Sequence, residues 1–274
     1  MQPELTILEP PRGWASINLR ELWRYRELFL FMVWRDVKTR YVQSVLGIGW
    51  AVLQPLITMV VFTVVFGGLA RMSSDGVPYA IFSFAGLVPW TYFANSLQTS
   101  SSSLVSASAL VTKVYFPRLV IPIAPVLAKL VDFAIAFVVL LVMMAVLGIY
   151  PTIWVLFVPV LVLMMIVTAC GFGMLLTALS AQYRDVKYAL TFGVQLLMYA
   201  APVIYPTSKI PEQWLGVYAL NPMVGVIEGF RAALLGTRPM PWDLIAYGAL
   251  PSVLVLVFGA LYFRRMERHF ADVI

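Results

Sequence analysis

The side chains that carry most protein chemistry are scarce in this chain. Its 274 residues include one cysteine, Cys170, and one histidine, His269. A single cysteine excludes a disulfide framework or a thiolate metal cluster within the chain, and we predict no metal site. Cys170 stands in the small-residue stretch A-C-G-F-G, which is more typical of close helix packing than of a reactive thiol.

Catalytic and nucleotide-binding motifs are missing as well. The sequence has no G-x-x-x-x-G-K-[ST] phosphate loop, no H-E-x-x-H and no serine-nucleophile elbow. A membrane transferase or hydrolase needs acids, bases or a metal at the lipid boundary, and the candidates reduce to Asp132, Asp185, Glu228 and Arg231. We therefore predict a chain that is not an enzyme, that holds no cofactor, and that depends on a separate energy source.

Charge is also low, because only 12% of the residues are charged whereas 61% are hydrophobic. A soluble domain carries about 25% charged residues, so the composition predicts an all-α integral membrane protein. The formal charge of +6 does not indicate a nucleic-acid partner, since the basic residues stand at the ends of apolar runs, where lipid headgroups favour them. The first fourteen residues lack an apolar core, so we expect no cleavable signal peptide.

The N-terminal part divides into an extended arm at residues 1–18 and an amphipathic helix at residues 19–42. In the helix, apolar residues recur at steps of three and four between charged ones. Its uninterrupted apolar stretch, residues 28–34, is too short to cross about 30 Å of hydrocarbon. We expect this helix to lie in the membrane interface.

Residues 43–274 are predicted to form a six-span domain, with spans at 46–70, 79–100, 125–149, 153–179, 188–204 and 244–263. Prolines at 122 and 125 suggest that the third span begins at about residue 125. That start places Lys129 and Asp132 in its first two turns, three residues apart on one face. A structural pair that reaches the interface is favoured over a proton relay, and both interpretations remain open.

The segment 206–236 is apolar enough to suggest a seventh span, but Asn221-Pro222 divides it and Glu228 and Arg231 stand within it. With six spans and an internal N-terminus, fourteen of the nineteen Lys and Arg residues are cytoplasmic and four are external. A seventh span would place the arginine-rich C-terminus outside, against the positive-inside rule. We therefore predict two short re-entrant helices that form an outer gate over a passage.

Several motifs together resemble one family: residues 19–41, V-L-G-I-G-W-A-V-L-Q-P-L at 45–56, K-V-Y-F-P-R at 113–118, Y-R-D-V at 183–186, L-N-P-M at 220–223 and E-G-F-R at 228–231. In this combination the chain resembles the permease subunit of type-2 ABC exporters for lipid-linked polysaccharides. The resemblance covers essentially the whole chain. The resemblance does not distinguish which polymer is exported: O-antigen, which we expect as the substrate, capsule or teichoic acid.

The resemblance implies a homodimer with two copies of a separate ATPase subunit, which binds ATP and Mg²⁺. It also implies a bacterial inner-membrane location, a lipid-linked polysaccharide substrate and cytoplasmic termini. The family's ATPase-coupling contacts correspond to Trp34, Arg35, Lys113, Phe116, Arg118, Arg184 and Asp185. Physically, Phe116 would fill a hydrophobic groove of the ATPase while basic side chains make charge-assisted contacts. The alternative is that these residues are ordinary positive-inside anchors.

A wet passage for a sugar polymer calls for flat aromatic faces with a polar edge. Five candidates are predicted near outer span ends: Trp90, Tyr92, Phe93, Tyr199 and Tyr205. Aromatic belts at the membrane interface are the competing explanation. For the chain as a whole, the alternatives are an ABC exporter permease for drugs or other lipids, and a membrane enzyme that acts on lipid-linked sugars.

Overall fold

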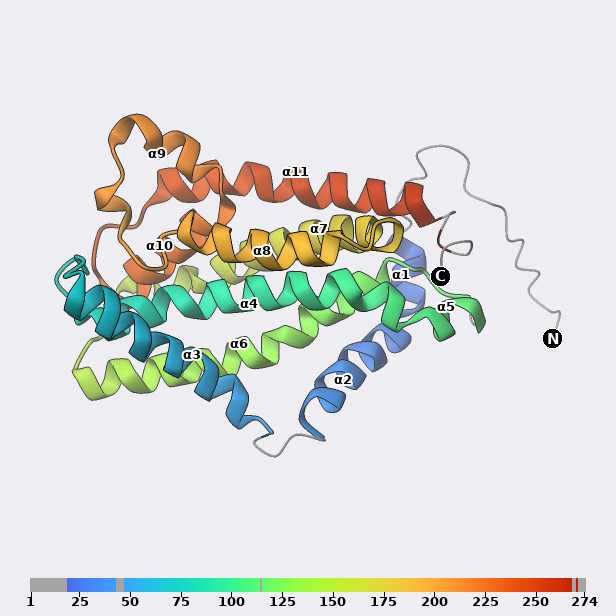
Figure 1. Ribbon diagram of the computed structural model, residues 1–274, viewed down its shortest axis with the longest axis horizontal. Coiled ribbons are helices and arrows are strands. Elements are labelled where there is room, and N and C mark those ends of the chain that lie inside the picture. Colours follow the sequence, from blue (N-terminus) through green and yellow to red (C-terminus); the bar gives the residue numbers. More distant parts are fainter. Residues whose placement is uncertain (1–18, 43–46, 114, 268–269, 271–274) are drawn as a thin grey trace.

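The computed structural model describes residues 19–42, 47–113, 115–267 and 270, and within these ranges it contains helices and no strand. The helices form one elongated bundle (Figure 1). The predicted arm at 1–18, residues 43–46 and His269 lie outside the described residues. The all-helical fold class predicted from composition is confirmed for the described part of the chain.

The interface helix is divided in two. Helix α1 (Leu19–Arg24) and helix α2 (Arg26–Val42) meet at Tyr25. Met32 of α2 is buried among the other helices, and α2 packs along α6. Leu30 and Trp34 are more than 60% exposed, so α2 presents large apolar side chains outward, as an interface helix in lipid would.

In the described part of the chain, four stretches of helix are long and apolar enough to cross a membrane: Gly49–Leu69, Val120–Leu147, Ile153–Gln182 and Trp242–Met266. The first joins helix α3 (Gly49–Phe62) to the π-helix η1 (Thr63–Leu69). The third joins the short 3-10 helix η2 (Ile153–Phe157) to helix α7 (Val158–Gln182). The second is helix α6 and the fourth is helix α11 (Trp242–Met266). Each has apolar side chains facing outward, which lipid can solvate.

The two other predicted spans correspond to helices that do not meet these criteria. Helix α4 (Tyr79–Ser106) has 28 residues, but serine and threonine fill its second half and lower its hydropathy. Helix α8 (Val186–Tyr199) has only 14 residues. Helix α4 packs against α6, α7 and α10 at the centre of the bundle. A helix that is surrounded by other helices can carry serine and threonine, because it does not need an apolar surface.

Helix α6 (Val120–Leu147) begins five residues before the predicted start. Pro122 is the third residue of α6, where proline is tolerated because the first four backbone N–H groups of a helix have no partner in it. Pro125 is the sixth residue and lies inside the helix. Lys129 and Asp132 therefore lie in the third and fourth turns, and the predicted placement in the first two turns is wrong.

Helices α7 and α11 make the most extensive contact in the bundle. A Cβ atom built on Gly171 of α7 would lie 2.6 Å from the backbone nitrogen of Leu256, and one on Gly259 of α11 would meet the carbonyl oxygen of Gly171. The absence of side chains at both glycines lets the two backbones touch. This contact explains the small residues around Cys170, which is itself buried.

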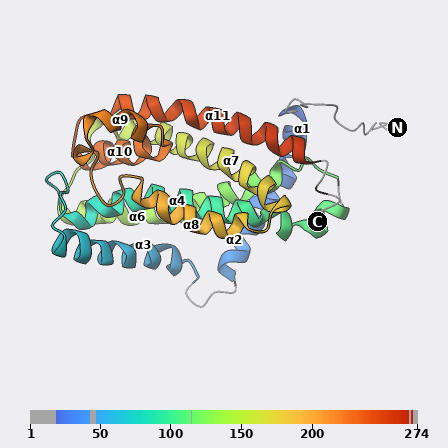
Figure 2. The ribbon, with the colours of Figure 1, turned by 45° about the horizontal axis from the view of Figure 1, so that its top comes forward.

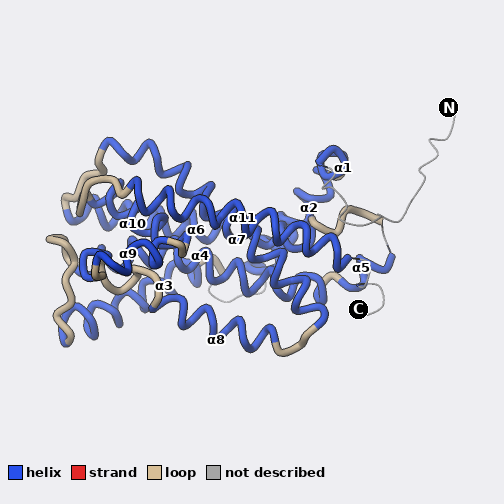
Figure 3. Tube along the Cα trace, turned by 90° about the horizontal axis from the view of Figure 1, so that it is seen from above, coloured by secondary structure: helices blue, strands red, loops and turns tan. Residues whose placement is uncertain are grey.

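Two short helices separate α8 from α11, namely α9 (Glu212–Ala219) and α10 (Pro222–Leu235). Every residue of α10 is buried, and Gly236 ends this helix in the left-handed conformation. Figures 1 and 3 show α9 and α10 at one end of the bundle, and α1 and the short helix α5 (Ser108–Lys113) at the other. Figure 2 shows α11 running the length between these ends.

Candidate functional site

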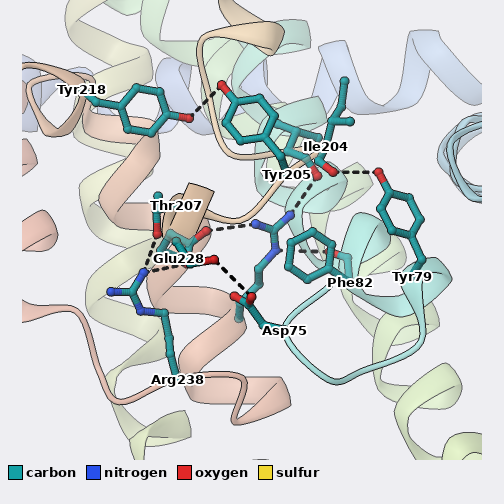
Figure 4. Close-up of polar contacts among 12 residues, drawn as sticks. Asp75, Tyr79, Phe82, Ile204, Tyr205, Thr207, Tyr218, Glu228 and Arg238 are labelled. Carbon is teal, nitrogen blue, oxygen red and sulfur yellow. Dashed lines mark hydrogen bonds and ion pairs between the residues drawn. The ribbon is translucent and has the colours of Figure 1, made fainter. Parts of the chain in front are cut away.

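The α10 end of the bundle is organised around a fully buried arginine, Arg231. Figure 4 labels three of its neighbours, Phe82, Glu228 and Arg238. Arg231 is 0% exposed, and its Nη1 donates to Glu228 Oε1 at 3.0 Å. Its Nε donates to the carbonyl oxygen of Phe82 at 3.2 Å and its Nη2 to that of Val203 at 2.8 Å. The guanidinium also lies 3.6 Å from the ring centroid of Phe82. One side chain thus joins α10 to α4 and to the segment after α8.

Glu228 has a second basic partner. Nη1 of Arg238 lies 3.3 Å from Glu228 Oε2 and also donates to Thr207 of the short helix η3 (Thr207–Lys209). Each carboxylate oxygen therefore contacts a guanidinium, which offsets the cost of removing the charges from water. We name Phe82, Val203, Glu228, Arg231 and Arg238 the Arg231 cluster.

The four residues predicted as the outer gate belong to one connected structure. The side chain of Asn221 accepts a hydrogen bond from the backbone N–H of Met223 at 3.1 Å, so it caps α10, and Pro222 occupies the first turn. Asn221 Nδ2 also donates to the carbonyl oxygen of Ala200 at 3.2 Å. Two hydrogen bonds thus connect α10 to the segment that follows α8: Asn221 to Ala200 before the first turn, and Arg231 to Val203 in the second half of the helix. The gating role itself stays a prediction.

The five aromatic candidates separate into two groups. Trp90, Tyr92 and Phe93 are at most 4% exposed and lie in the middle of α4, not near one of its ends. The Tyr92 hydroxyl donates to the carbonyl oxygen of Val126 at 3.1 Å. Tyr199 is 52% exposed, and the partly buried Tyr205 donates to its carbonyl oxygen at 2.6 Å. Only this second pair offers aromatic surface outside the chain's own core.

At the α5 end, the predicted coupling segment is held against the bundle. Lys113 is exposed, whereas Phe116 is 3% exposed and packs in a cluster with Met32 of α2. Arg118 Nη1 donates to the carbonyl oxygen of Glu267, directly after α11, at 2.8 Å. The expectation that Phe116 reaches into a groove of another subunit is wrong for this conformation, because the chain's own core already covers the ring.

Arg184 and Asp185 lie in the exposed turn between α7 and α8. Arg184 and Lys187 line a cavity of about 710 Å³ together with the buried Ser180 and with Ser108 of α5. Among the residues that the structure describes, neither basic side chain has an ion-pair partner. The cavity borders α5 at Ser108 and the α7–α8 turn at Arg184. We call Lys113, Arg118, Arg184 and Lys187 the basic surface at the α5 end.

The remaining coupling candidates, Trp34 and Arg35, both lie on α2, but their side chains have different surroundings. Trp34 is 65% exposed. Arg35 bonds to the carboxylate of Asp36, with Nη2 at 2.8 Å and Nε at 3.1 Å. In the part of the chain that the structure covers, no group of three histidine, cysteine or acidic side chains is placed to hold a metal ion.

The sequence did not reveal a joint between α2 and α6. Arg40 Nη1 lies 2.7 Å from Asp132 Oδ2, the Tyr41 hydroxyl donates to Asp132 Oδ1, and Lys129 Nζ lies 3.6 Å from Oδ2. Burial raises the pKa of Tyr41 above its usual range, and the hydrogen bond to the carboxylate raises it further. The spacing correctly predicted the pair Lys129 and Asp132, but the partners Tyr41 and Arg40 of α2 are 91 and 92 residues from Asp132 in sequence.

A scan against protein-family models matches residues 27–235 to the ABC-2 type transporter family. The chain belongs to this family. It is 32% identical over 252 residues to the O-antigen export system permease protein RfbA of Myxococcus xanthus, which covers 91% of this chain and 96% of that protein. It is 27% identical over 250 residues to RfbA of Klebsiella pneumoniae, covering 90% and 95%. It is 21% identical over 234 residues to the polysialic acid transport protein KpsM of Escherichia coli, covering 85% and 91%.

The chain is therefore a multi-pass ABC-2 permease, a transport subunit rather than an enzyme. The ATP-binding site of such a transporter lies on a partner ATPase. This agrees with the absence of a phosphate loop in the sequence. The predicted family, the predicted transport function and the predicted dependence on a separate energy source are confirmed.

Proposed function

We propose that this permease exports a lipid-linked polysaccharide, with O-antigen as the best candidate, across the bacterial inner membrane. The observation that carries the substrate class is the end-to-end similarity to RfbA of Myxococcus xanthus, which spans 96% of that protein without a missing domain. We propose further that two copies of the permease assemble with two copies of the ATPase, which binds ATP and Mg²⁺.

The proposed topology has six spans. Four spans are the apolar stretches. The other two are α4, which lies among them, and α8, whose 14 residues continue into a turn with residues 201–204 buried. Helices α9 and α10 then form the re-entrant segment at the outer face. Support comes from the basic residues Lys113, Arg118, Arg184 and Lys187, which gather at the α5 end, as the positive-inside rule requires of a cytoplasmic face.

The proposed passage is bordered by the exposed face of α8. Tyr188, Phe192, Leu196 and Tyr199 are each more than 50% exposed along this helix, and a second copy or the substrate would cover them. The outer gate is proposed to be α10 with the Arg231 cluster. Tyr199 and Tyr205 are the aromatic candidates that this arrangement favours. Trp90, Tyr92 and Phe93 would border the passage only after the helices around α4 rearrange.

Work from ATP hydrolysis is proposed to enter through the basic surface at the α5 end and through α2. Exposed Arg184 and Asp185 offer direct charge-assisted contacts. Buried Phe116 and the Arg118–Glu267 hydrogen bond would hold the contact segment rigid against α11. A permease for drugs or other lipids would use the same coupling, so the substrate must be tested directly.

The test is reconstitution of the permease with its ATPase in liposomes that contain a lipid-linked glycan. Arg184→Glu should leave ATP hydrolysis measurable but lower glycan export at least tenfold, because it reverses a charge at the ATPase contact. The matched control is Lys209→Glu, which reverses an exposed charge at the opposite end. Equal export by Arg184→Glu and wild type would reject the coupling site. ATP-dependent movement of a drug but not of the glycan would reject the substrate class.

A further inference from the structure

A second cavity, of about 480 Å³, lies between α2, the serine-rich second half of α4, and the first turns of α6. It is distinct from the Arg231 cluster and from the basic surface at the α5 end. Its charged lining residues come from two elements: Arg35, Asp36 and Arg40 from α2, and Lys129 and Asp132 from α6. Three of these side chains are cations and two are anions.

The charges in this cavity do not cancel. Arg35 is paired with Asp36 at 2.8 Å, and Arg40 with Asp132 at 2.7 Å. Lys129 Nζ lies 3.6 Å from Asp132 Oδ2, an oxygen that also forms the ion pair with Arg40 but accepts no hydrogen bond from a described residue. Lys129 itself makes no hydrogen bond to any described residue. Its side chain is nonetheless 9% exposed. An ammonium carries three N–H donors, so the Lys129 ammonium can bind an anionic group that enters the cavity.

The opposite wall supplies acceptors. Ser102, Ser103 and Ser106 of α4 donate their hydroxyl hydrogens to backbone carbonyl groups three or four residues earlier in the same helix. Their oxygen lone pairs therefore remain available to the cavity. A ligand that fits both walls has an anionic group toward Lys129 and hydroxyl groups toward the serines.

The depth of the cavity indicates where this ligand resides. Helix α2, which lines the cavity, exposes more than 60% of Leu30, Phe31 and Trp34, a row of apolar side chains that the membrane interface would cover. Trp50, which lines the adjoining pocket with Lys129, lies in the first turn of the span α3. The cavity thus lies level with the lipid headgroups of the leaflet that α2 contacts.

We propose that this cavity binds the phosphate-bearing, hydroxylated head of an inner-leaflet lipid, with Lys129 as the main phosphate ligand. The surplus positive charge of the cavity attracts a phosphate group, which carries one negative charge in a phosphodiester and two in a diphosphate diester. A glycerol-headed phospholipid and a polyprenyl-diphosphate-linked sugar share this chemistry. The inference rests on the proposed placement of α2 at the inner face, and it does not require ATP-driven export.

The experiment uses the full-length permease without the ATPase, delipidated and placed in phosphatidylcholine nanodiscs. Binding of phosphatidylglycerol, of a polyprenyl-diphosphate sugar and of inorganic diphosphate is measured by native mass spectrometry. Lys129→Gln should weaken binding of at least one of the two lipids by about tenfold to a hundredfold, the loss expected for one charge-assisted hydrogen bond. Lys129→Arg should retain most of the binding.

Lys38→Gln is the matched control, because Lys38 is an exposed lysine of α2 that does not line the cavity. It should bind as wild type does. Preference for the glycerol lipid identifies a structural lipid, and preference for the diphosphate sugar identifies a contact with the cargo; both support the site. Unchanged lipid binding by Lys129→Gln, an equal loss in Lys38→Gln, or binding of inorganic diphosphate alone overturns the proposal. Because no export is measured, failure here leaves the proposed transport function standing.

Discussion

Replacing the buried Arg231 by methionine is the sharpest test of how the outer end of this permease is held together. The change preserves most of the side-chain length but leaves Glu228 with Arg238 alone and leaves the carbonyl oxygens of Phe82 and Val203 without this donor. Removing one partner of a buried ion pair costs about 3–5 kcal/mol. For a chain of this size, that corresponds to a fall in unfolding temperature on the order of 10 °C.

Cys170 provides the assay. It is the single cysteine of the chain and is buried beside the α7–α11 contact, so a thiol-reactive dye labels it only when the helices separate. Dye fluorescence during heating in detergent then reports unfolding of Arg231→Met. Lys209→Met, an exposed change at the same end, should alter stability by less than about 0.5 kcal/mol.

The double variant Arg231→Met with Glu228→Gln separates charge from hydrogen bonding. Glutamine removes the buried carboxylate that after the first change keeps only Arg238 as an ionic partner, but it leaves the two carbonyl oxygens unpaired, which costs about 1–3 kcal/mol for each group. We therefore expect the double variant to recover part of the lost stability. If it unfolds at the same temperature as Arg231→Met or lower, the ion pair is not what the single change disrupts, and the reasoning fails.

Three further predictions follow from other contacts. Asp132→Asn should weaken the contacts of α6 with Arg40 and Tyr41 of α2. In the reconstituted complex, export should then fall at least tenfold while ATP hydrolysis continues; unchanged export per ATP hydrolysed would contradict this prediction. Gly259→Val should lower the Cys170-dye unfolding temperature by several degrees, because a side chain there meets the Gly171 carbonyl; a wild-type melting curve would be the contrary result. Tyr199→Cys in a Cys170→Ala background should react with a water-soluble thiol reagent, and protection by lipid alone would indicate a belt residue.

Much of the fold was predictable because lipid imposes simple rules on a sequence. Uncharged runs of about twenty residues must be helical, since no water satisfies the backbone in hydrocarbon. The charge bias between loops argued against a seventh span in the segment 206–236. In the structure, this segment contains the short helices α9 and α10. The rule was less informative for α4, because a helix surrounded by other helices does not need an apolar surface and carries serine and threonine instead.

The candidate sites were predictable only as residue types. Arg184, Asp185 and Lys113 are exposed charges in or beside turns, and a sequence indicates such positions directly. The predicted contact of Phe116 with the ATPase was wrong for this conformation. The local sequence, an aromatic residue between basic ones, is the same whether the ring faces a partner protein or the core of its own chain. Its position in the chain's own core depends on Met32 of α2, far away in sequence.

The sequence by itself determined that this protein is a bundle of lipid-solvated helices that carries no phosphate loop, because hydrophobicity and motif content are properties of the chain alone. Only the tertiary structure decided which polar groups meet inside the bundle. Arg40 reaches Asp132 across 92 positions, and Arg231 reaches the carbonyl of Phe82 across 149. Such pairs form because packed helices leave few places where a buried charge finds a partner, and those places depend on helix positions that no local pattern encodes.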